Sequence, residues 1–278
     1  MRAVEEQTVL ITGATDGLGR ALAHALASRA ATVLLHGRDP ARLVQMQRDI
    51  RAASGNDRVR SYRAELAVLA AVRHLAMQVE RDHDRLDLLI NNAGIGAGRP
   101  GAPRELSADG YELRFAINYL APFLLTNLLV PLLQRSAPAR VVNVASAGQA
   151  PVDFDDVMLE RGYDGMHAYR QSKLALILFT FELAERLRAA GAGVTVNALH
   201  PATLMDTKMV REWFGYARSS VEEGVEATLQ LAIAAELDGT SGLYFDGLRE
   251  ARAHPQAYDP AARRRLWRLS EAYTAAVP

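Results

Sequence analysis

Short apolar runs alternate with helical patterns along the whole chain, and this alternation restricts the fold more than any other feature. Runs rich in Val, Ile and Leu lie at residues 8–12, 32–35, 86–90, 140–144 and 193–198. Apolar residues with helical spacing fill the segments between them, at 18–29, 41–53, 66–79, 107–133 and 166–190. Near-continuous apolar strands that alternate with helices are typical of a parallel sheet with helices on both faces. The sequence therefore predicts an α/β fold: a single domain, residues 1–278, built on one doubly wound parallel sheet.

Two long segments break the alternation. Residues 149–165 form a polar, acidic connection, and residues 201–220 carry Trp213, Phe214 and Tyr216 without clear periodicity. Long loops in compact domains often carry function. We therefore expect both segments near a substrate, and we assign 201–220 as the substrate-loop region.

The C-terminal tail, at about residues 246–278, contains one helical pattern at 259–273. Its basic triplet, residues 263–265, stands among acidic and apolar residues, so we interpret it as a solvated face and not as a binding patch. We expect a surface helix here.

Composition excludes several classes of function. The 32 basic and 32 acidic residues cancel, so no overall field attracts nucleic acid or an anionic membrane. The absence of cysteine removes disulfides and thiolate chemistry. No histidine has metal-ligand spacing, so we expect no metal, and we interpret His200 as a loop residue. Residues 1–7 lack the apolar core of a signal peptide and no membrane span is predicted, so a cytoplasmic protein is expected.

A glycine-rich turn follows the first apolar run. Gly13, Gly17 and Gly19 lie where a strand leads into a helix. Glycine allows the backbone to turn tightly and to approach a pyrophosphate, while the start of the helix offers unpaired N–H groups. The turn predicts a dinucleotide site, although a glycine turn alone is weak evidence.

Five segments, in this order, resemble the short-chain dehydrogenase/reductase family. They are the turn Thr12-Gly13-x-x-x-Gly17-x-Gly19, the segment Asn91-Asn92-Ala93-Gly94, Asn118, Ser146, and the pair Tyr169 and Lys173. The resemblance implies a Rossmann fold, a nicotinamide cofactor and a catalytic set formed by Asn118, Ser146, Tyr169 and Lys173. It also implies a set of cofactor contacts: Gly13, Thr15, Asp16, Gly17, Leu18, Gly19, Arg38, Glu65, Leu66, Asn92, Ala93, Gly94, Tyr169, Lys173, Pro201 and Thr203.

The chain is more closely similar to the retinol-dehydrogenase-like branch of that family. The segments 153–156, 169–175 and 178–179 match it, as do the 22 residues between Ser146 and Tyr169. This resemblance implies a lipophilic aldehyde, ketone or alcohol as the substrate.

Two positions depart from the family pattern. Pro201 is followed by Ala202 where the family commonly has glycine, with Thr203 next and Thr207 later than usual. Glu65 stands where the family commonly has aspartate near the adenine. These departures affect the expected cofactor contacts, not the proton-transfer residues.

The end of the second apolar run favours NADP(H) over NAD(H). A site specific for NAD is expected to place a carboxylate there to bind the ribose hydroxyls, but this chain has Gly37. The next residue, Arg38, can offer its planar set of donors to a 2′-phosphate. The alternative is that Arg38 is a solvated residue without a role in binding. Use of both NADP(H) and NAD(H) also stays open, because Asp39 follows Arg38 and could supply a carboxylate.

Tyr169 and Lys173 lie one turn apart on the same face of a predicted helix. A free tyrosine has a pKa of about 10, which a neighbouring ammonium and the oxidised nicotinamide ring would lower. Tyr169 is then the general acid for reduction and the general base for oxidation. Ser146, after a strand, can hold the substrate oxygen. By resemblance Lys173 binds the nicotinamide ribose, and Asn118 supports a water next to Lys173.

Two alternative functions stay open. The same residues could carry out dehydration, isomerisation or cyclisation, or the chain could be a cofactor-sensing binding protein. A hydrolase triad with Ser146 is disfavoured because that serine lacks the Gly-x-Ser-x-Gly pattern. The apolar run at residues 174–179 must be covered on more than one side, either by the chain itself or by a second subunit, so a homo-oligomer is possible.

Overall fold

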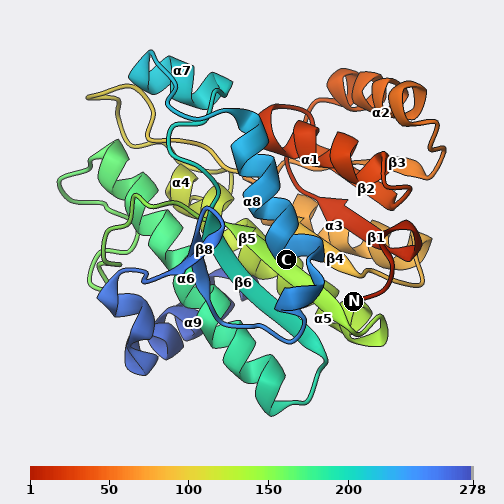
Figure 1. Ribbon diagram of the computed structural model, residues 1–278. Coiled ribbons are helices and arrows are strands. Elements are labelled where there is room, and N and C mark those ends of the chain that lie inside the picture. The colour runs from red at the N-terminus through yellow and green to blue at the C-terminus, as the bar shows by residue number, and fades with distance from the viewer. Residues whose placement is uncertain (277–278) are drawn as a thin grey trace.

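The computed structural model describes residues 1–276, without the side chains of residues 209, 212 and 214. These residues form one eight-stranded sheet in the order β3-β2-β1-β4-β5-β6-β7-β8 (Figure 1). Neighbouring strands are parallel except β7 and β8, which are antiparallel. The strands are β1 (Thr8–Ile11), β2 (Thr32–Gly37), β3 (Val59–Arg63), β4 (Leu88–Asn91), β5 (Ala139–Val144), β6 (Val194–His200), β7 (Tyr244–Asp246) and β8 (Arg249–Ala251).

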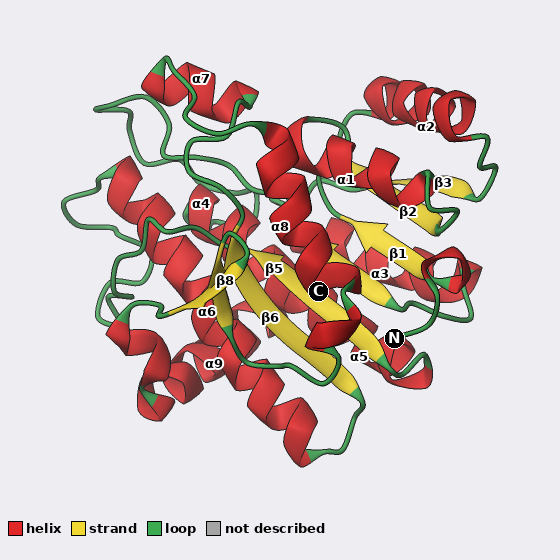
Figure 2. Cartoon of the chain, viewed as in Figure 1, coloured by secondary structure: helices red, strands yellow, loops and turns green. Residues whose placement is uncertain are grey.

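Helices cover both faces of this sheet, with α8 in front of it and α3 and α5 behind it in the view of Figure 2. The main helices are α1 (Gly17–Ala27), α2 (Pro40–Ser54), α3 (Leu69–Asp82), α5 (Ala121–Arg135), α6 (Gly165–Ala189), α8 (Val221–Ile233) and α9 (Pro260–Ala275). Two short helices, α4 (Leu113–Phe115) and α7 (Lys208–Phe214), lie in the connections. The predicted doubly wound α/β fold is confirmed.

Side chains that alternate along the strands build two separate cores. In β1, Leu10 belongs to the core under α3, α5 and α6, whereas Val9 and Ile11 belong to the core under α1, α2 and α8. Successive residues of a strand point to opposite faces, so a strand that is apolar throughout must be covered on both sides. This is the physical reason why the apolar runs predicted a buried parallel sheet.

Some predicted elements differ from the observed ones. The helical pattern at 107–133 was predicted as one helix, but the helix begins at Leu113 and passes through a π-helical turn at Ala116–Leu120 before α5. The residues before Leu113 form a turn instead, with a hydrogen bond from the N–H of Ser107 to the carbonyl of Tyr111 and an isolated β-bridge between Leu106 and Glu112. The prediction of a loop at His200 was also wrong, because this residue ends β6.

The run at 174–179 is covered by the chain itself. Leu174 through Phe179 are all buried in α6, and the indole of Trp267 in α9 stacks on Phe179 with 5.9 Å between ring centroids. Helix α9 was predicted as a surface helix, but Leu266 and Trp267 are buried against α6. The apolar run therefore needs no second subunit to cover it.

One stretch, Leu113–Arg135, is long and apolar enough to cross a membrane by length and composition. Most of that stretch is buried inside the fold, as in the core helices of proteins that do not span membranes. It is therefore weak evidence for a span.

Candidate active site

The glycine turn lies between the end of β1 and the start of α1. Gly13 and Gly17 have positive φ angles of 68° and 48°, which side chains disfavour. A Cβ at Gly19 would overlap the carbonyl oxygen of Gly13 and the amide of Asn92. Asp16 caps α1 by accepting the N–H of Gly17 at 2.8 Å. Glycine is thus required at these positions by the turn itself.

The segment after β4 holds this turn in place. The hydroxyl oxygen of Thr12 accepts the N–H groups of Asn92 and Ala93, each at 3.0 Å. The amide nitrogen of Asn92 donates to the carbonyls of Thr12 (2.9 Å) and Gly13 (3.2 Å). The two segments that resemble the family's cofactor motifs are therefore brought together.

The same structure places Tyr169 and Lys173 near the end of β5. The Lys173 Nζ atom lies 5.9 Å from the centroid of the Tyr169 ring and donates to the carbonyl oxygen of Val144 at 2.9 Å. Burial lowers the pKa of Lys173 to about 8. Burial also raises the pKa of Tyr169, although hydrogen bonding with Ser146 opposes this change. The protein alone does not lower the tyrosine pKa, so the expected lowering needs further positive charge.

Ser146 follows β5 directly. Its hydroxyl oxygen accepts the N–H of Gly148 at 3.0 Å, and its carbonyl oxygen accepts the hydroxyl of Tyr244 at 3.1 Å. A side chain from β7 and the loop after β5 therefore fix this serine beside Tyr169.

Asn118 lies in the π-helical turn and is completely buried. Its Oδ1 accepts the N–H of Ile95 at 2.8 Å, while Nδ2 donates to the Ile95 carbonyl and to Ser172 Oγ, each at 3.0 Å. A Cβ at Gly94 would lie 3.2 Å from Asn118 Oδ1 and 3.4 Å from Lys173 Nζ. The extra residue in a π turn is often found at functional sites, and here it directs Asn118 toward Lys173.

Three arginines, Arg38, Arg42 and Arg63, lie around the end of β2. Arg38 follows β2, and its carbonyl accepts the Nε–H of Arg63 at 3.3 Å. Arg42 in α2 donates to the carboxylate of Asp16 at 3.0 Å, a pair that the sequence analysis missed. Asp39, the residue after Arg38, caps α2 by accepting the N–H groups of Ala41 (2.9 Å) and Arg42 (3.1 Å). One carboxylate oxygen of Asp39 is therefore bound to the start of α2.

The remaining predicted contacts lie around the same edge of the sheet. Glu65 Oε1 accepts the N–H of Ala67 at 3.2 Å, and Leu66 is buried. Pro201 is buried, but exposed Thr203 bonds to His200 at 3.1 Å.

Of the two threonines in the substrate-loop region, Thr207 is the one next to the glycine turn. A Cβ at Gly17 would lie 3.2 Å from its Cγ2 atom. Thr203 bonds instead to His200 at the end of β6. The sequence alone could not show that Thr207 lies next to the glycine turn, because the path of the loop determines which threonine reaches it.

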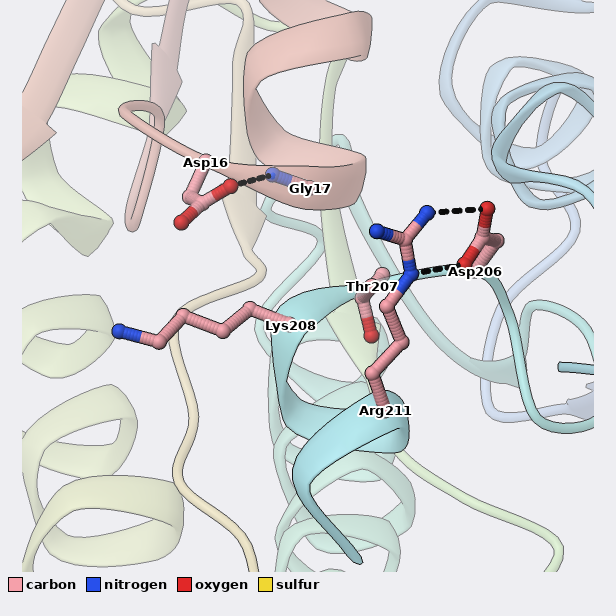
Figure 3. Close-up of a pocket in the computed structure, with 6 residues that line it drawn as sticks. All are labelled: Asp16, Gly17, Asp206, Thr207, Lys208 and Arg211. Carbon is pink, nitrogen blue, oxygen red and sulfur yellow. Dashed lines mark hydrogen bonds and ion pairs between the residues drawn. The ribbon is translucent and has the colours of Figure 1, made fainter. Parts of the chain in front are cut away.

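A cavity of about 430 Å³ lies between the glycine turn and α7. It is lined by Asp16, Gly17, Asp206, Thr207, Lys208 and Arg211 (Figure 3). Arg211 pairs with Asp206, while the side chain of Lys208 extends toward the Asp16 side of the cavity. Burial works to raise the pKa of Asp16, but hydrogen bonds and the nearby charges of Arg42 and Lys208 bring it below its ordinary value.

Trp213 in α7 covers the tyrosine. Its ring stands edge-on to that of Tyr169, with 5.7 Å between centroids. A Cβ at Gly96 would overlap the indole, so this glycine makes room for it. The sequence analysis expected 201–220 near the substrate but did not select Trp213.

These residues fit a nicotinamide dinucleotide. The glycine turn opens onto a cavity lined by the cations Lys208 and Arg211 as well as by the carboxylates Asp16 and Asp206. The turn and the start of α1 at its edge suit a pyrophosphate. The buried ammonium of Lys173 donates to the Val144 carbonyl, and because an ammonium can donate three hydrogen bonds it can also donate to a bound ribose. Among the described residues, no group of three or more His, Asp or Glu side chains is placed to hold a metal ion.

The family model for short chain dehydrogenases matches residues 7–216, and the chain belongs to this family. The chain is 40% identical to retinol dehydrogenase 13 of Mus musculus, over 94% of this chain and 81% of that protein. The predicted resemblance to the retinol-dehydrogenase-like branch is thus confirmed, as is the prediction of an NAD(P)-dependent enzyme.

Solved structures show the same fold. An uncharacterized protein from Mycobacterium paratuberculosis superposes with a TM-score of 0.79 at 32% identity, covering 97% of this chain and 94% of that one. A short chain dehydrogenase from Shigella flexneri, solved with NADP, superposes with a TM-score of 0.71 at 25% identity, covering 88% of this chain and 98% of that one.

Proposed function

We propose that the protein is an NADP(H)-dependent oxidoreductase that transfers hydride between nicotinamide and a carbonyl or alcohol group of a lipophilic small molecule. The observation that carries the proposal is the convergence of Tyr169, Ser146 and Lys173 beside the end of β5. The glycine turn and its cavity lie at the same edge of the sheet, where ligands bind in doubly wound folds.

Each residue of this set has a separate task. Ser146 orients the substrate oxygen toward the tyrosine hydroxyl, and Tyr169 gives that oxygen a proton in reduction or takes one in oxidation. Lys173 binds the nicotinamide ribose and stabilises the tyrosinate. The bound nicotinamide supplies or accepts the hydride, and its oxidised ring carries the positive charge that favours ionised Tyr169.

Asn118 has a positioning task in this proposal. Its side chain bonds to both backbone groups of Ile95 and to Ser172, which follows Tyr169 by three residues in α6. It thereby joins the loop after β4 to the helix that carries the proton donor. Asn118 supports the proton path next to Lys173.

The preference for NADP(H) is supported by the charges at the adenosine end. Arg38 is exposed directly after β2, and Arg42 in α2 lies beside Asp16. Guanidinium groups suit a 2′-phosphate because they offer several donors in one plane. The carboxylate of Asp39 caps α2, so one of its oxygens is already bound to two N–H groups of the helix. The NADP in the Shigella flexneri structure adds indirect support.

A lipophilic substrate is supported by two independent observations. Trp213 places an aromatic surface against the reactive tyrosine. Curated relatives at 34–40% identity are named retinol dehydrogenases, and retinol is an apolar alcohol. We therefore propose an apolar aldehyde, ketone or alcohol.

The test follows NADPH absorbance while the protein is mixed with lipophilic aldehydes, ketones and quinones, retinaldehyde among them. Short polar aldehydes are the matched control substrates. We expect NADPH oxidation with apolar carbonyl compounds, faster than with the polar ones and faster than with NADH. Tight NADPH binding without turnover of any compound, in either direction, would contradict a redox function and favour a non-redox enzyme or a cofactor sensor.

A further inference from the structure

A buried histidine that the reaction does not use joins the glycine turn to the neighbouring strands. His36 lies in β2 and is 3% exposed. The N–H of Gly13 donates to its Nδ1 atom at 3.2 Å, and its Nε2 atom lies 3.2 Å from the carbonyl oxygen of Ala64. The backbone carbonyl of His36 also accepts the N–H of Ala14 at 2.8 Å. Two successive N–H groups of the turn are thus bound to one residue.

The two partners determine which nitrogen of the ring carries the proton. Because Gly13 offers an N–H, Nδ1 must present a lone pair, and Nε2–H then donates to the Ala64 carbonyl. Only this neutral tautomer satisfies both contacts. Burial lowers the pKa of His36 to about 4, against the opposing effects of the Ala64 carbonyl and the charge of Glu65. The imidazole is therefore neutral near pH 7.

Gly13 is held from two sides. Asn92 donates to its carbonyl oxygen from the segment after β4, while His36 accepts its N–H from β2. Because Gly13 has no Cβ it is intrinsically free to adopt many conformations, of which the observed positive φ is one. Two hydrogen bonds on opposite sides of its backbone remove that freedom. The imidazole and the asparagine therefore both restrain the backbone of Gly13.

The second contact reaches the adenine side of the site. Ala64 precedes Glu65 and Leu66, the segment that the family resemblance places next to the adenine. Its N–H donates to the carbonyl of Gly37, also in β2, at 3.2 Å. The ring of His36 thus connects the glycine turn after β1 with the segment that begins at Ala64 after β3.

We propose that His36 is a positioning residue for the cofactor: its neutral Nδ1 atom orients the Gly13 turn, and its Nε2–H orients the segment that begins at Ala64. The proposal rests on the proposed role of the glycine turn in holding the cofactor. An ordinary core histidine, which contributes only to stability, is the competing explanation.

Two substitutions separate the two ends of the ring. Asparagine carries its amide on Cγ, at the level of Nδ1, so His36→Asn keeps an acceptor for Gly13 and loses the contact with Ala64. Glutamine carries its amide one carbon further out, at the level of Nε2, so His36→Gln keeps a donor for Ala64 and loses the acceptor for Gly13. Each variant removes one buried hydrogen bond, which makes them matched controls for stability.

The measurements are the Kd for NADPH, by fluorescence titration of the full chain, and the midpoint of urea unfolding. We expect similar losses of stability in the two variants but unequal losses of affinity. His36→Asn should bind NADPH within about twofold of the original protein, and His36→Gln at least about fivefold more weakly, because it leaves the Gly13 N–H without its acceptor. Equal affinities in the two folded variants, or affinity losses that merely follow stability, would overturn the proposal.

A nuclear magnetic resonance measurement on the unsubstituted protein covers the case in which a variant does not fold. The His36 ring should carry its proton on Nε2, and the Gly13 amide resonance should shift when NADPH is added. A proton on Nδ1 would reject the role of His36 while leaving the cofactor site intact. A Gly13 resonance that NADPH does not move would instead reject the glycine turn as the cofactor site, and the inference with it.

Discussion

Trp213 stands edge-on to Tyr169, with 5.7 Å between the centroids of their rings. The tryptophan lies in α7, which follows β6, so a helix that is distant in sequence covers Tyr169. Gly96, in the loop after β4, provides the space for the indole. Access to the tyrosine therefore depends on a contact between α7 and the loop after β4.

Substitution of Gly96 should disturb this contact. In Gly96→Val the added side chain overlaps the indole and displaces Trp213 from Tyr169. An edge-to-face pair contributes about 0.5–1.5 kcal/mol, so we expect a change of about two- to tenfold in the KM of an apolar substrate. Tryptophan emission, measured in a Trp267→Phe background, should shift as well. Trp213→Phe, which keeps an aromatic ring, is the control and should change KM less. Unchanged KM and emission in Gly96→Val would refute the contact.

Removal of Arg38 should affect the two nicotinamide cofactors differently. Charge-assisted hydrogen bonds contribute about 1.5–3 kcal/mol, so Arg38→Ala should weaken NADPH by about 10- to 100-fold and leave NADH almost unchanged. Arg42→Ala should act in the same direction but more weakly, because its charge is shared with Asp16. Arg48→Ala removes an exposed arginine further along α2 and serves as the control. Equal losses for NADPH and NADH would show that no 2′-phosphate is bound here.

The stability of the protein should depend on pH through His36. Its pKa is about 4 in the folded protein and about 6.5 when unfolded, so the unfolded chain binds more protons between these values. Stability should be fully present above about pH 6.5 and fall as the pH drops toward 4, by up to about 3 kcal/mol from this residue. Urea unfolding across this range should show a shallower loss for His36→Asn. Parallel pH profiles for the two proteins would contradict the shifted pKa.

Helix α9 should contribute strongly to stability. Trp267 is buried between Phe123 and Phe179, and the guanidinium of Arg186 lies 4.0 Å from its ring centroid. Trp267→Ala should lower the free energy of unfolding by about 3–5 kcal/mol, measured with urea. The exposed Arg264 on the same helix is the matched position, and Arg264→Ala should change stability by less than about 0.5 kcal/mol. A small effect at Trp267 would mean that the tail does not pack on α6.

Apolar periodicity was sufficient to predict the central strands, because they are buried on both faces. It missed β3, in which only Val59 and Tyr62 are buried, and the short strands β7 and β8. Helix α8 was also missed, although Ser220 and Glu223 form a capping box that could have revealed its start.

The motif residues of the site could be identified from spacing and resemblance, but contacts between distant segments could not. Trp213 reaches Tyr169, Arg42 reaches Asp16 and His36 reaches Gly13 only through the fold. Such contacts depend on loop paths and strand order, which leave no local pattern in the sequence. The rise in the pKa of Tyr169 could not be predicted either, because it is caused by burial, which only the fold reveals.

The central claim is that Tyr169 transfers the proton while Lys173 also holds the cofactor. The decisive measurement compares Kd for NADPH and turnover of an apolar carbonyl compound in Tyr169→Phe and Lys173→Ala. Tyr169→Phe should leave the affinity for NADPH nearly unchanged and lower turnover by about 10²- to 10⁴-fold, because only the hydroxyl that transfers the proton is lost. Lys173→Ala should impair both affinity and turnover. Near-normal turnover in Tyr169→Phe would contradict the mechanism even if the fold and the cofactor site were correct.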